Sequence, residues 1–268
     1  MSLFKILKDR INDIVISDEV IAKLNKIPNK LNELGYDNWG MHLNTLQKVL
    51  SVLKWMSEKY FRTEIYGIDD VPANRVMLVA NHGGQLPIDA AMVCYAMCMH
   101  AKKPRIVRTM ADRFMPTLPF ISILVKRSGQ ILGTPENCRD LLYNDEAVMT
   151  FPEGTRGLGK LYWKRYQLQS FGSGFMRIAL DTETPIVPVA IIGTEEAYPS
   201  FYNIKPVAKL LKMPYFPVTP FWPILGPLGC LPLPVKVKIY FGKPIIFSGD
   251  FDGSELEIRS KVDIVYNC

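Results

Sequence analysis

The sequence predicts an α/β fold in which a mixed, mostly parallel sheet is layered by helices and preceded by an N-terminal helical piece. Apolar residues recur at helical spacing before residue 60, whereas short apolar runs alternate with helical patterns after it. The chain has 268 residues, 48% of them hydrophobic, which is enough for one α/β domain with a small accessory piece. We therefore expect residues 1–60 to form amphipathic helices in contact with a membrane surface, and residues 61–268 to form the α/β domain.

The N-terminal piece is expected to contain three helical segments. Over residues 3–14, apolar positions recur at helical spacing among basic residues, which suits either an interfacial helix or a helix packed on its own core. Residues 17–35 predict a helix that Ser17 caps and Pro28 interrupts. A clearer amphipathic helix follows over residues 43–56, where leucines and a methionine lie on one stripe.

After residue 60, strands and helices are expected to alternate. Short apolar runs predict strands at residues 64–68, 75–80, 105–109, 147–151, 186–192 and 235–241. Helical patterns lie between them, at residues 90–100, 118–126, 136–143 and 174–181. Near the end of the chain, Ser254 and Glu257 have the spacing of a capping box, which predicts a last helix. Alternation of this kind is typical of a sheet covered by helices.

One long segment near the end is uncharged and unusually rich in proline. Residues 213–235 contain no charged residue, and that length alone would suit a transmembrane helix. The segment contains seven prolines, each of which removes a backbone donor and blocks helical continuation, so a spanning helix is excluded. We expect the segment either to cover the core or to rest on a bilayer surface.

The charge balance favours an anionic partner. The 32 lysines and arginines outnumber the 26 aspartates and glutamates, which suits nucleic acid, an anionic membrane or a phosphorylated ligand. The basic residues are dispersed and not interleaved with aromatic ones, so we do not expect nucleic-acid binding. The five cysteines lack the spacing of a metal site, so we expect reduced thiols and no metal. Residues 1–16 lack the features of a secretory signal, which favours a cytosolic setting.

His82 is the best candidate for a catalytic side chain. It follows the apolar run of residues 76–80 and precedes two glycines, and α/β proteins place their sites at the carboxyl ends of such strands. Asp89 lies at the start of the next helix, where the helix dipole favours an ionised carboxylate. A carboxylate bonded to one imidazole nitrogen fixes the tautomer and raises the basicity of the other nitrogen. His82 would then serve as a general base, although lone His–Asp pairs also occur in structural roles.

A second motif spans residues 151–157. It follows another predicted strand, so it should emerge at the same edge of the sheet as His82. Its two glycines allow close backbone approach, and Arg156 offers a bidentate fork for phosphate or carboxylate. Arg127, at the end of a predicted helix, could also face an anion.

Together these motifs resemble the glycerophospholipid acyltransferase family, typified by lysophosphatidate (1-acylglycerol-3-phosphate) acyltransferases. The resemblance rests on Asn81-His82 with Asp89, on Phe-Pro-Glu-Gly-Thr-Arg at 151–156, and on Pro-Ile-Val-Pro-Val at 185–189. It extends over about residues 60–243. It implies transfer of an acyl chain from acyl-CoA or acyl carrier protein to the free hydroxyl of a lysophospholipid, first of all 1-acylglycerol-3-phosphate. No cofactor beyond the acyl donor is implied.

The resemblance also assigns roles to particular residues. His82 would deprotonate the acceptor hydroxyl and Asp89 would orient His82, by analogy with the family. Binding of the acceptor headgroup would fall to the second motif, that is, to Glu153, Gly154, Thr155 and Arg156. As a further hypothesis, the backbone N–H groups of Gly83 and Gly84 would stabilise the oxyanion. The protein would act as a peripheral or monotopic protein at the cytoplasmic face of a membrane, with the lysophospholipid, the acyl thioester and the membrane surface as its partners.

The sequence departs from the family pattern at two points. Six residues separate His82 from Asp89, whereas the usual motif has four. The second family motif normally ends in an arginine that binds the acceptor phosphate, and residues 129–135 lack it; Arg127 or Arg139 would have to replace it. The alternative is an acceptor without a phosphomonoester, such as another lysolipid or diacylglycerol.

Two alternatives lie outside this family. A serine hydrolase needs a Gly-x-Ser-x-Gly elbow, and residues 171–175 fail that pattern. A non-catalytic lipid-binding protein would leave the placement of His82 and Asp89 without a purpose.

Overall fold

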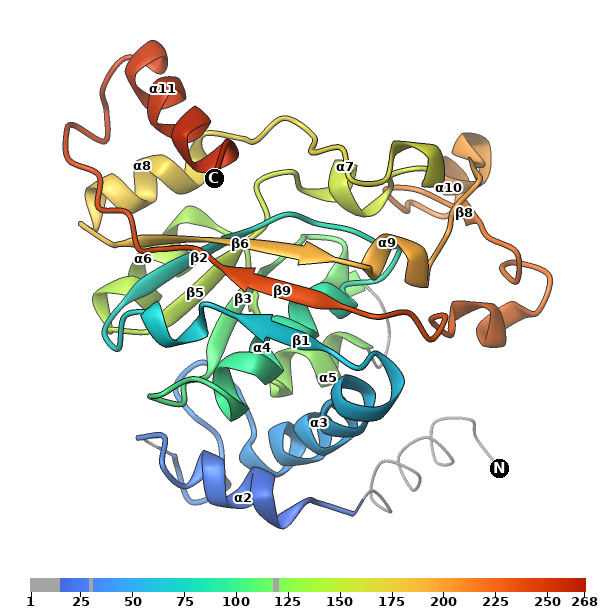
Figure 1. Cartoon of the computed structure of the whole chain (residues 1–268), viewed down its shortest axis with the longest axis horizontal. Coiled ribbons are helices and arrows are strands. Elements are labelled where there is room, and N and C mark those ends of the chain that lie inside the picture. Colours follow the sequence, from blue (N-terminus) through green and yellow to red (C-terminus); the bar gives the residue numbers. More distant parts are fainter. Residues whose placement is uncertain (1–14, 29–30, 118–120) are drawn as a thin grey trace.

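A seven-stranded sheet forms the centre of the computed structural model, which describes residues 15–28, 31–117 and 121–268 (Figure 1). The strands lie in the order β1-β9-β6-β2-β5-β3-β4. Their bounds are β1 Glu64–Tyr66, β2 Val76–Ala80, β3 Val107–Ala111, β4 Ile131–Leu132, β5 Ala147–Thr150, β6 Ile186–Ile192 and β9 Lys238–Phe241. Only the β6–β9 pair of this sheet is antiparallel, which confirms the predicted mixed, mostly parallel sheet.

Helices cover both faces of the sheet. On one face lie α2 (Asp18–Leu24), α3 (Leu43–Trp55) and α4 (Ile88–Met99), and on the other α6 (Pro135–Tyr143), α8 (Gly174–Asp181) and α11 (Glu255–Tyr266) (Figure 1). The central strand β2 shows why both faces need cover. Val76, Leu78 and Ala80 are buried in the first layer, whereas Met77 and Val79 are buried in the second. A strand buried on both faces is a continuous apolar run, as in other parallel sheets.

The N-terminal piece follows the prediction only in part. The helical pattern of residues 3–14 lies outside the described residues. The helix predicted over residues 17–35 ends at Leu24, four residues before Pro28, because a proline ring clashes with the carbonyl four positions earlier. Ser17 occupies the N-cap position but its side chain makes no capping bond. The amphipathic helix α3 is confirmed, with Leu46, Leu50 and Leu53 buried.

The last helix begins as its sequence predicts. The Ser254 hydroxyl accepts from the Glu257 N–H, and the Glu257 carboxylate accepts from the Ser254 N–H, so the capping box at the start of α11 is confirmed. The helix predicted over residues 118–126 is α5, which spans Ile121–Arg127 in the described chain.

The proline-rich segment 213–235 is irregular. It contributes the short strand β8 (Pro217–Val218), which pairs with β7 (Tyr202–Asn203), and a 3-10 helix at Gly226–Cys230. In the part of the chain that the structure describes, no helix has the length and apolar character needed to cross a bilayer. The helices α7 (Thr155–Leu158), α9 (Thr194–Ala197) and α10 (Lys205–Leu210) lie at the same end of the molecule (Figure 1).

Candidate active site

The carboxyl end of β2 carries Asn81 and His82. The Asn81 amide donates to the Ile191 carbonyl at 2.9 Å and accepts from the Ile191 N–H at 2.6 Å, so it fastens the end of β2 to β6. The residue that follows is thereby fixed relative to two strands. The imidazole of His82 stacks on Phe151, which follows the neighbouring parallel strand β5, with ring centroids 4.0 Å apart.

His82 and Asp89 form a buried pair. The distance from Nδ1 of His82 to Oδ2 of Asp89 is 2.6 Å, and the two residues are 7% and 0% exposed. The carboxylate also accepts from the N–H groups of Gly83 at 3.0 Å and Ala90 at 2.7 Å. The six-residue spacer therefore brings the two side chains together. Because Nδ1 faces Asp89, Nε2 is the nitrogen available for proton transfer.

The second motif packs directly on the His82 loop. A Cβ atom at Gly157 would lie 2.7 Å from the His82 Cβ and 3.0 Å from its carbonyl oxygen. These distances are shorter than the contacts that Cβ atoms ordinarily make. The His82 Cβ and carbonyl oxygen cannot move aside as the tip of a flexible side chain could. Only glycine at this position allows α7 to approach His82 so closely.

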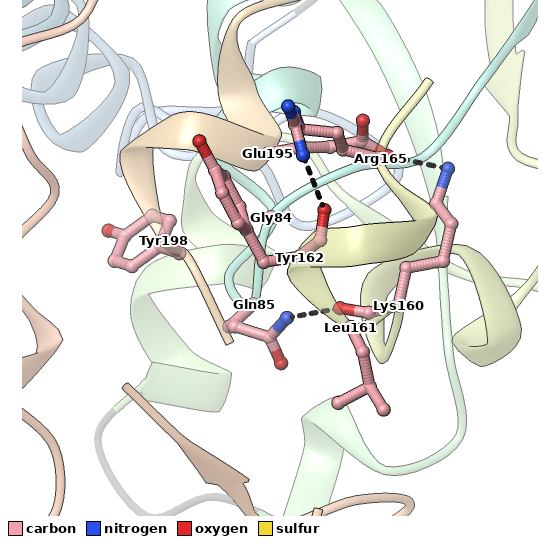
Figure 2. A pocket seen from close by; sticks show the side chains of 8 residues that line it. All are labelled: Gly84, Gln85, Lys160, Leu161, Tyr162, Arg165, Glu195 and Tyr198. Carbon is pink, nitrogen blue, oxygen red and sulfur yellow. Dashed lines mark hydrogen bonds and ion pairs between the residues drawn. The ribbon is translucent and has the colours of Figure 1, made fainter. Parts of the chain in front are cut away.

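Glu153 holds the backbone of His82. One carboxylate oxygen accepts from the His82 N–H at 2.8 Å, and the other accepts from the Gln169 N–H at 2.7 Å. The ammonium of Lys160 lies 3.6 Å from Glu153 and 2.6 Å from Glu195, and all three side chains are largely buried. Figure 2 shows the Lys160–Glu195 part of this polar wall, with the ion pair drawn as a dashed line. Through Glu153, the segments that carry Lys160, Gln169 and Glu195 are connected to the backbone of His82.

The remaining predicted residues take different positions. Thr155 lines the cavity that His82 also lines, and Gly154 is exposed with φ of +59°. Arg156 donates to the hydroxyl and the carbonyl of Ser170, both at 3.0 Å. The role predicted for Arg156 in acceptor binding stays a prediction.

The structure does not bring Arg127 or Arg139 to the site. The guanidinium of Arg127 lies over the Tyr36 ring, 5.8 Å from its centroid, and Arg139 pairs with Asp181. Of the two proposed oxyanion donors, the Gly83 N–H already donates to Asp89, so it is engaged in the pair itself. The Gly84 N–H is not engaged by another group in the described structure, so its role as an oxyanion donor stays a prediction.

A largely apolar cavity of about 450 Å³ lies beside His82. Its walls come from α3, α4, β3, α5 and the proline-rich segment, including Leu50, Ala91, Met110, Leu124 and Trp222. Among the described lining residues there is no lysine or arginine. In the same described part of the chain, no group of three or more His, Cys, Asp or Glu side chains is placed to hold a metal ion.

Two tyrosines of the cavity carry no motif and were not predicted from the sequence. Tyr198 and Tyr215 both line it, and burial raises the pKa of each hydroxyl above its usual range, so both are neutral donors. The Tyr215 hydroxyl donates to the Gln85 carbonyl at 2.8 Å. No local signal marks either residue, since each reaches the site through contacts far apart in the chain.

Comparisons with known proteins relate this chain to acyltransferases. The model of the family described as Acyltransferase matches residues 62–192. An uncharacterized protein of Mycobacterium tuberculosis is 39% identical over 217 residues, which are 80% of this chain and 60% of that protein. The human "DGAT1/2-independent enzyme synthesizing storage lipids" is 25% identical over 199 residues, 74% of this chain and 58% of that protein. The chain thus spans about three fifths of the length of these relatives.

A solved structure shares the fold. The 1-acyl-sn-glycerophosphate (LPA) acyltransferase PlsC from Thermotoga maritima superposes with a TM-score of 0.51 at 19% identity, covering 83% of this chain and 78% of that one. The match supports the arrangement of the sheet and its helices.

Proposed function

We propose that this chain, of which residues 62–192 match the model of the Acyltransferase family, is an O-acyltransferase, which moves an acyl chain from a thioester to the free hydroxyl of a lipid alcohol. The observation that carries the proposal is the His82–Asp89 pair, 2.6 Å apart, in which His82 lines an apolar cavity of about 450 Å³. The pair supplies a base, and the cavity supplies room for fatty acyl chains.

The reaction needs one proton acceptor and no covalent enzyme intermediate. His82 Nε2 takes the proton of the acceptor hydroxyl while the oxygen attacks the thioester carbonyl. The tetrahedral intermediate collapses with cleavage of the C–S bond, and the departing thiolate takes the proton from the imidazolium. An ester and a free thiol result.

Asp89 is a positioning residue in this scheme. Its bond to Nδ1 keeps the proton on that nitrogen and leaves Nε2 unprotonated, and its negative charge stabilises the imidazolium that forms. The two backbone donors from Gly83 and Ala90 hold the carboxylate in place. Glu153, through its bond to the His82 N–H, positions the backbone of the same residue.

For the acceptor, the first candidate is a lysophospholipid such as 1-acylglycerol-3-phosphate. Thr155 lines the cavity and Arg156 is exposed next to it in the chain, which supports a role for this part of the second motif in binding a headgroup at the cavity's edge. The acyl donor would be acyl-CoA or acyl carrier protein.

A neutral lipid alcohol such as diacylglycerol is the second candidate. The described cavity wall contains no lysine or arginine, and both arginines considered as replacements lie elsewhere. A phosphomonoester inside such a wall would be left without a cation, whereas diacylglycerol needs none. The similarity to the human enzyme synthesizing storage lipids supports the same candidate.

A membrane surface is proposed as the partner that supplies the lipid. Exposed apolar and basic residues are concentrated in the segments around α10 and β8, and we call this set the basic apolar face. Figure 1 shows where α10 and β8 lie in the molecule. Tyr162 contacts Phe201 edge to face at 5.8 Å, and Phe201 donates to Val218, so its segments are contiguous. The face consists of Trp163, Lys164, Arg165, Tyr166, Phe201, Tyr202, Lys205, Lys209, Leu210, Leu211 and Lys212.

Such a face suits an anionic bilayer. Aromatic rings favour the lipid headgroup region, and lysines are attracted to negative headgroups. Residues 199–235 contain no aspartate or glutamate. The adjoining proline-rich segment exposes Ile224 at 82% and Leu228 at 67%, so its outer side is apolar while its inner side lines the cavity. The bilayer would be that of a cytoplasmic membrane face.

The experiment that tests the function is thiol release from long-chain acyl-CoA and, separately, from acyl carrier protein. Purified protein is given each donor alone and with 1-acylglycerol-3-phosphate, other lysophospholipids or diacylglycerol. Release that requires one acceptor supports the proposal and identifies that acceptor. Release without an acceptor indicates a thioesterase and overturns it, and silence with every pair indicates a lipid-binding protein and overturns it as well.

A further inference from the structure

Tyr198 has a buried hydroxyl with no hydrogen-bond partner in the described structure. It follows α9, is 5% exposed and lines the cavity that also contains His82. Its ring edge lies against the His82 loop, since a Cβ atom at Gly84 would be 3.3 Å from its Cδ2. In Figure 2 the ring stands apart from the Lys160–Glu195 pair and its hydroxyl points away from them. The polar wall therefore does not satisfy this hydroxyl.

No acceptor of the described residues lies within hydrogen-bond distance of the hydroxyl. The titratable groups that act on it are Cys230 and Tyr60, and the Tyr60 hydroxyl donates to the Pro232 carbonyl at 2.6 Å. A buried donor without a partner destabilises a folded protein, and native structures contain few of them. Tyr215, on the same cavity wall, has its hydroxyl paired with Gln85. Of the two tyrosine hydroxyls in this cavity wall, that of Tyr215 is hydrogen-bonded and that of Tyr198 is not.

We propose that the Tyr198 hydroxyl donates a hydrogen bond to the carbonyl oxygen of a fatty acyl group lying in the cavity. The inference rests on the proposed function for the class of ligand. In an apolar cavity the acyl chain itself offers no acceptor, so the carbonyl at its head is the group that such a donor recognises. That carbonyl belongs either to an ester already on the acceptor or to the thioester of the donor. Tyr198 then selects ligands by their carbonyl group.

Equilibrium binding tests this without turnover. Each ligand is titrated alone into the protein, and quenching of tryptophan fluorescence, to which Trp222 in the cavity wall contributes, reports binding. The acceptor arm compares 1-acyl- with 1-O-alkyl-glycerol-3-phosphate, which lacks the carbonyl. The donor arm compares an acyl-CoA with the S-alkyl-CoA thioether of equal length. Both arms are run on the native protein, on Tyr198→Phe and on the matched control Tyr215→Phe.

We expect a preference for the carbonyl-bearing ligand in only one of the two arms, because Tyr198 binds either the acceptor ester or the donor thioester. Native protein binds the carbonyl-bearing ligand of that arm about tenfold more tightly than its partner, and Tyr198→Phe removes this preference by weakening only that ligand. Tyr215→Phe leaves the preference unchanged. In addition, unliganded Tyr198→Phe should unfold at a higher denaturant concentration than the native protein, because it no longer buries an unpaired hydroxyl.

Two results would overturn the inference. Equal weakening of both ligands in each arm would assign Tyr198 a purely structural role, and an unchanged preference in Tyr198→Phe would assign the recognition elsewhere. Neither result touches the proposed function, which thiol release measures separately. If no acyl lipid or acyl-CoA binds to the native protein, the proposed function fails together with the inference.

Discussion

His82 is held from three sides, and this determines which proton it can move. Asp89 binds one ring nitrogen, Glu153 binds the backbone N–H, and Phe151 stacks on the ring. Rotation of the imidazole would break the bond to Asp89 and the stacking together. The histidine is therefore preorganised with Nε2 as its free nitrogen, which is what a base needs before substrate arrives.

Replacing this base should stop the chemistry without unfolding the protein. His82→Ala is expected to lower turnover by about two to four orders of magnitude, the usual range for a lost general base. The measurement is the rate of thiol release with saturating donor and acceptor. His100→Ala, which removes an exposed histidine at the end of α4, is the matched control and should retain the native rate. Comparable rates in both variants would remove His82 from the mechanism.

Gly157 should be intolerant of the smallest side chain. Gly157→Ala places a Cβ atom 2.7 Å from the His82 Cβ, so α7 or the His82 loop must shift. We expect a loss of stability of about 1–3 kcal/mol and a lower turnover number. Gly174→Ala is the control, because a Cβ there meets nothing within 4 Å. If Gly157→Ala kept both its denaturation midpoint and its rate, the close packing would be of no consequence for the site.

The sequence predicts the residues whose roles follow from local order in the chain, and misses those that act across it. His82 follows a strand and Asp89 opens the next helix, so the sequence marks both as candidates, whereas their contact across the six-residue spacer is seen only in the structure. The engagement of Gly83 with Asp89 was not, because it depends on the path of the turn between them. Tyr198 has no motif at all, and its importance is visible only in its missing partner.

Among the elements, length decides which could be predicted. The five strands of four or more residues have enough positions to show an apolar pattern, and each was predicted near its observed bounds. The two-residue strands β4, β7 and β8 cannot show a period, so they were missed. Gly67, with φ of +72°, ends β1 at Tyr66 instead of Ile68, because its left-handed backbone departs from the strand.

The helix α10 and the turn after it provide the test of membrane binding. Reversing Lys205, Lys209 and Lys212 to glutamate should weaken partition onto vesicles containing anionic phospholipid by about a hundredfold, since each lysine near such a surface contributes about 1 kcal/mol. Flotation with vesicles of defined composition measures the partition. Binding should also fall with salt in the native protein.

A matched variant with the same charge change provides the comparison. Lys102, Lys103 and Lys243 are exposed and belong to loops next to the amino ends of the parallel strands, away from α10. Their reversal to glutamate should weaken partition far less. Equal losses in the two triple variants would mean that net charge, and not the basic apolar face, determines the binding.

At the scale of the whole molecule, a buried ion pair joins the N-terminal piece to the sheet. Arg108 on β3 donates to Asp37 at 2.6 Å, and their side chains are 3% and 8% exposed. Glu146 lies 3.4 Å from the same guanidinium nitrogen. The helices before residue 60 are therefore fastened to the sheet by charge as well as by apolar packing.

Removing only one partner of this ion pair should lower the stability of the protein. Arg108→Met is expected to lower the free energy of unfolding by about 3–5 kcal/mol, because it leaves Asp37 buried without its cation. Denaturant titration measures the loss. The double variant Arg108→Met with Asp37→Asn should recover part of it, since the uncompensated charge is gone. A double variant no more stable than the single one would mean that the charge is not the source of the loss.

The layered fold could be predicted from the sequence, whereas the strand order could not. Alternating strands and helices predict a mostly parallel sheet, but they do not predict that β9 lies between β1 and β6. The cavity escapes prediction for the same reason. Its walls combine α3 with the proline-rich segment, which are more than 150 residues apart in the chain.

The position of β9 has a consequence for how the chain is made. Glu64 of β1 lies opposite Lys238 of β9, and β1 has no other neighbour in the sheet. At translation rates of about 5–20 residues per second, the nascent β1 waits roughly 10–35 s for its partner. Once β6 has been made, its edge also stays open until β9 follows. The newborn chain thus carries two unpaired strand edges until β9 emerges, and unpaired edges of this kind are prone to aggregate.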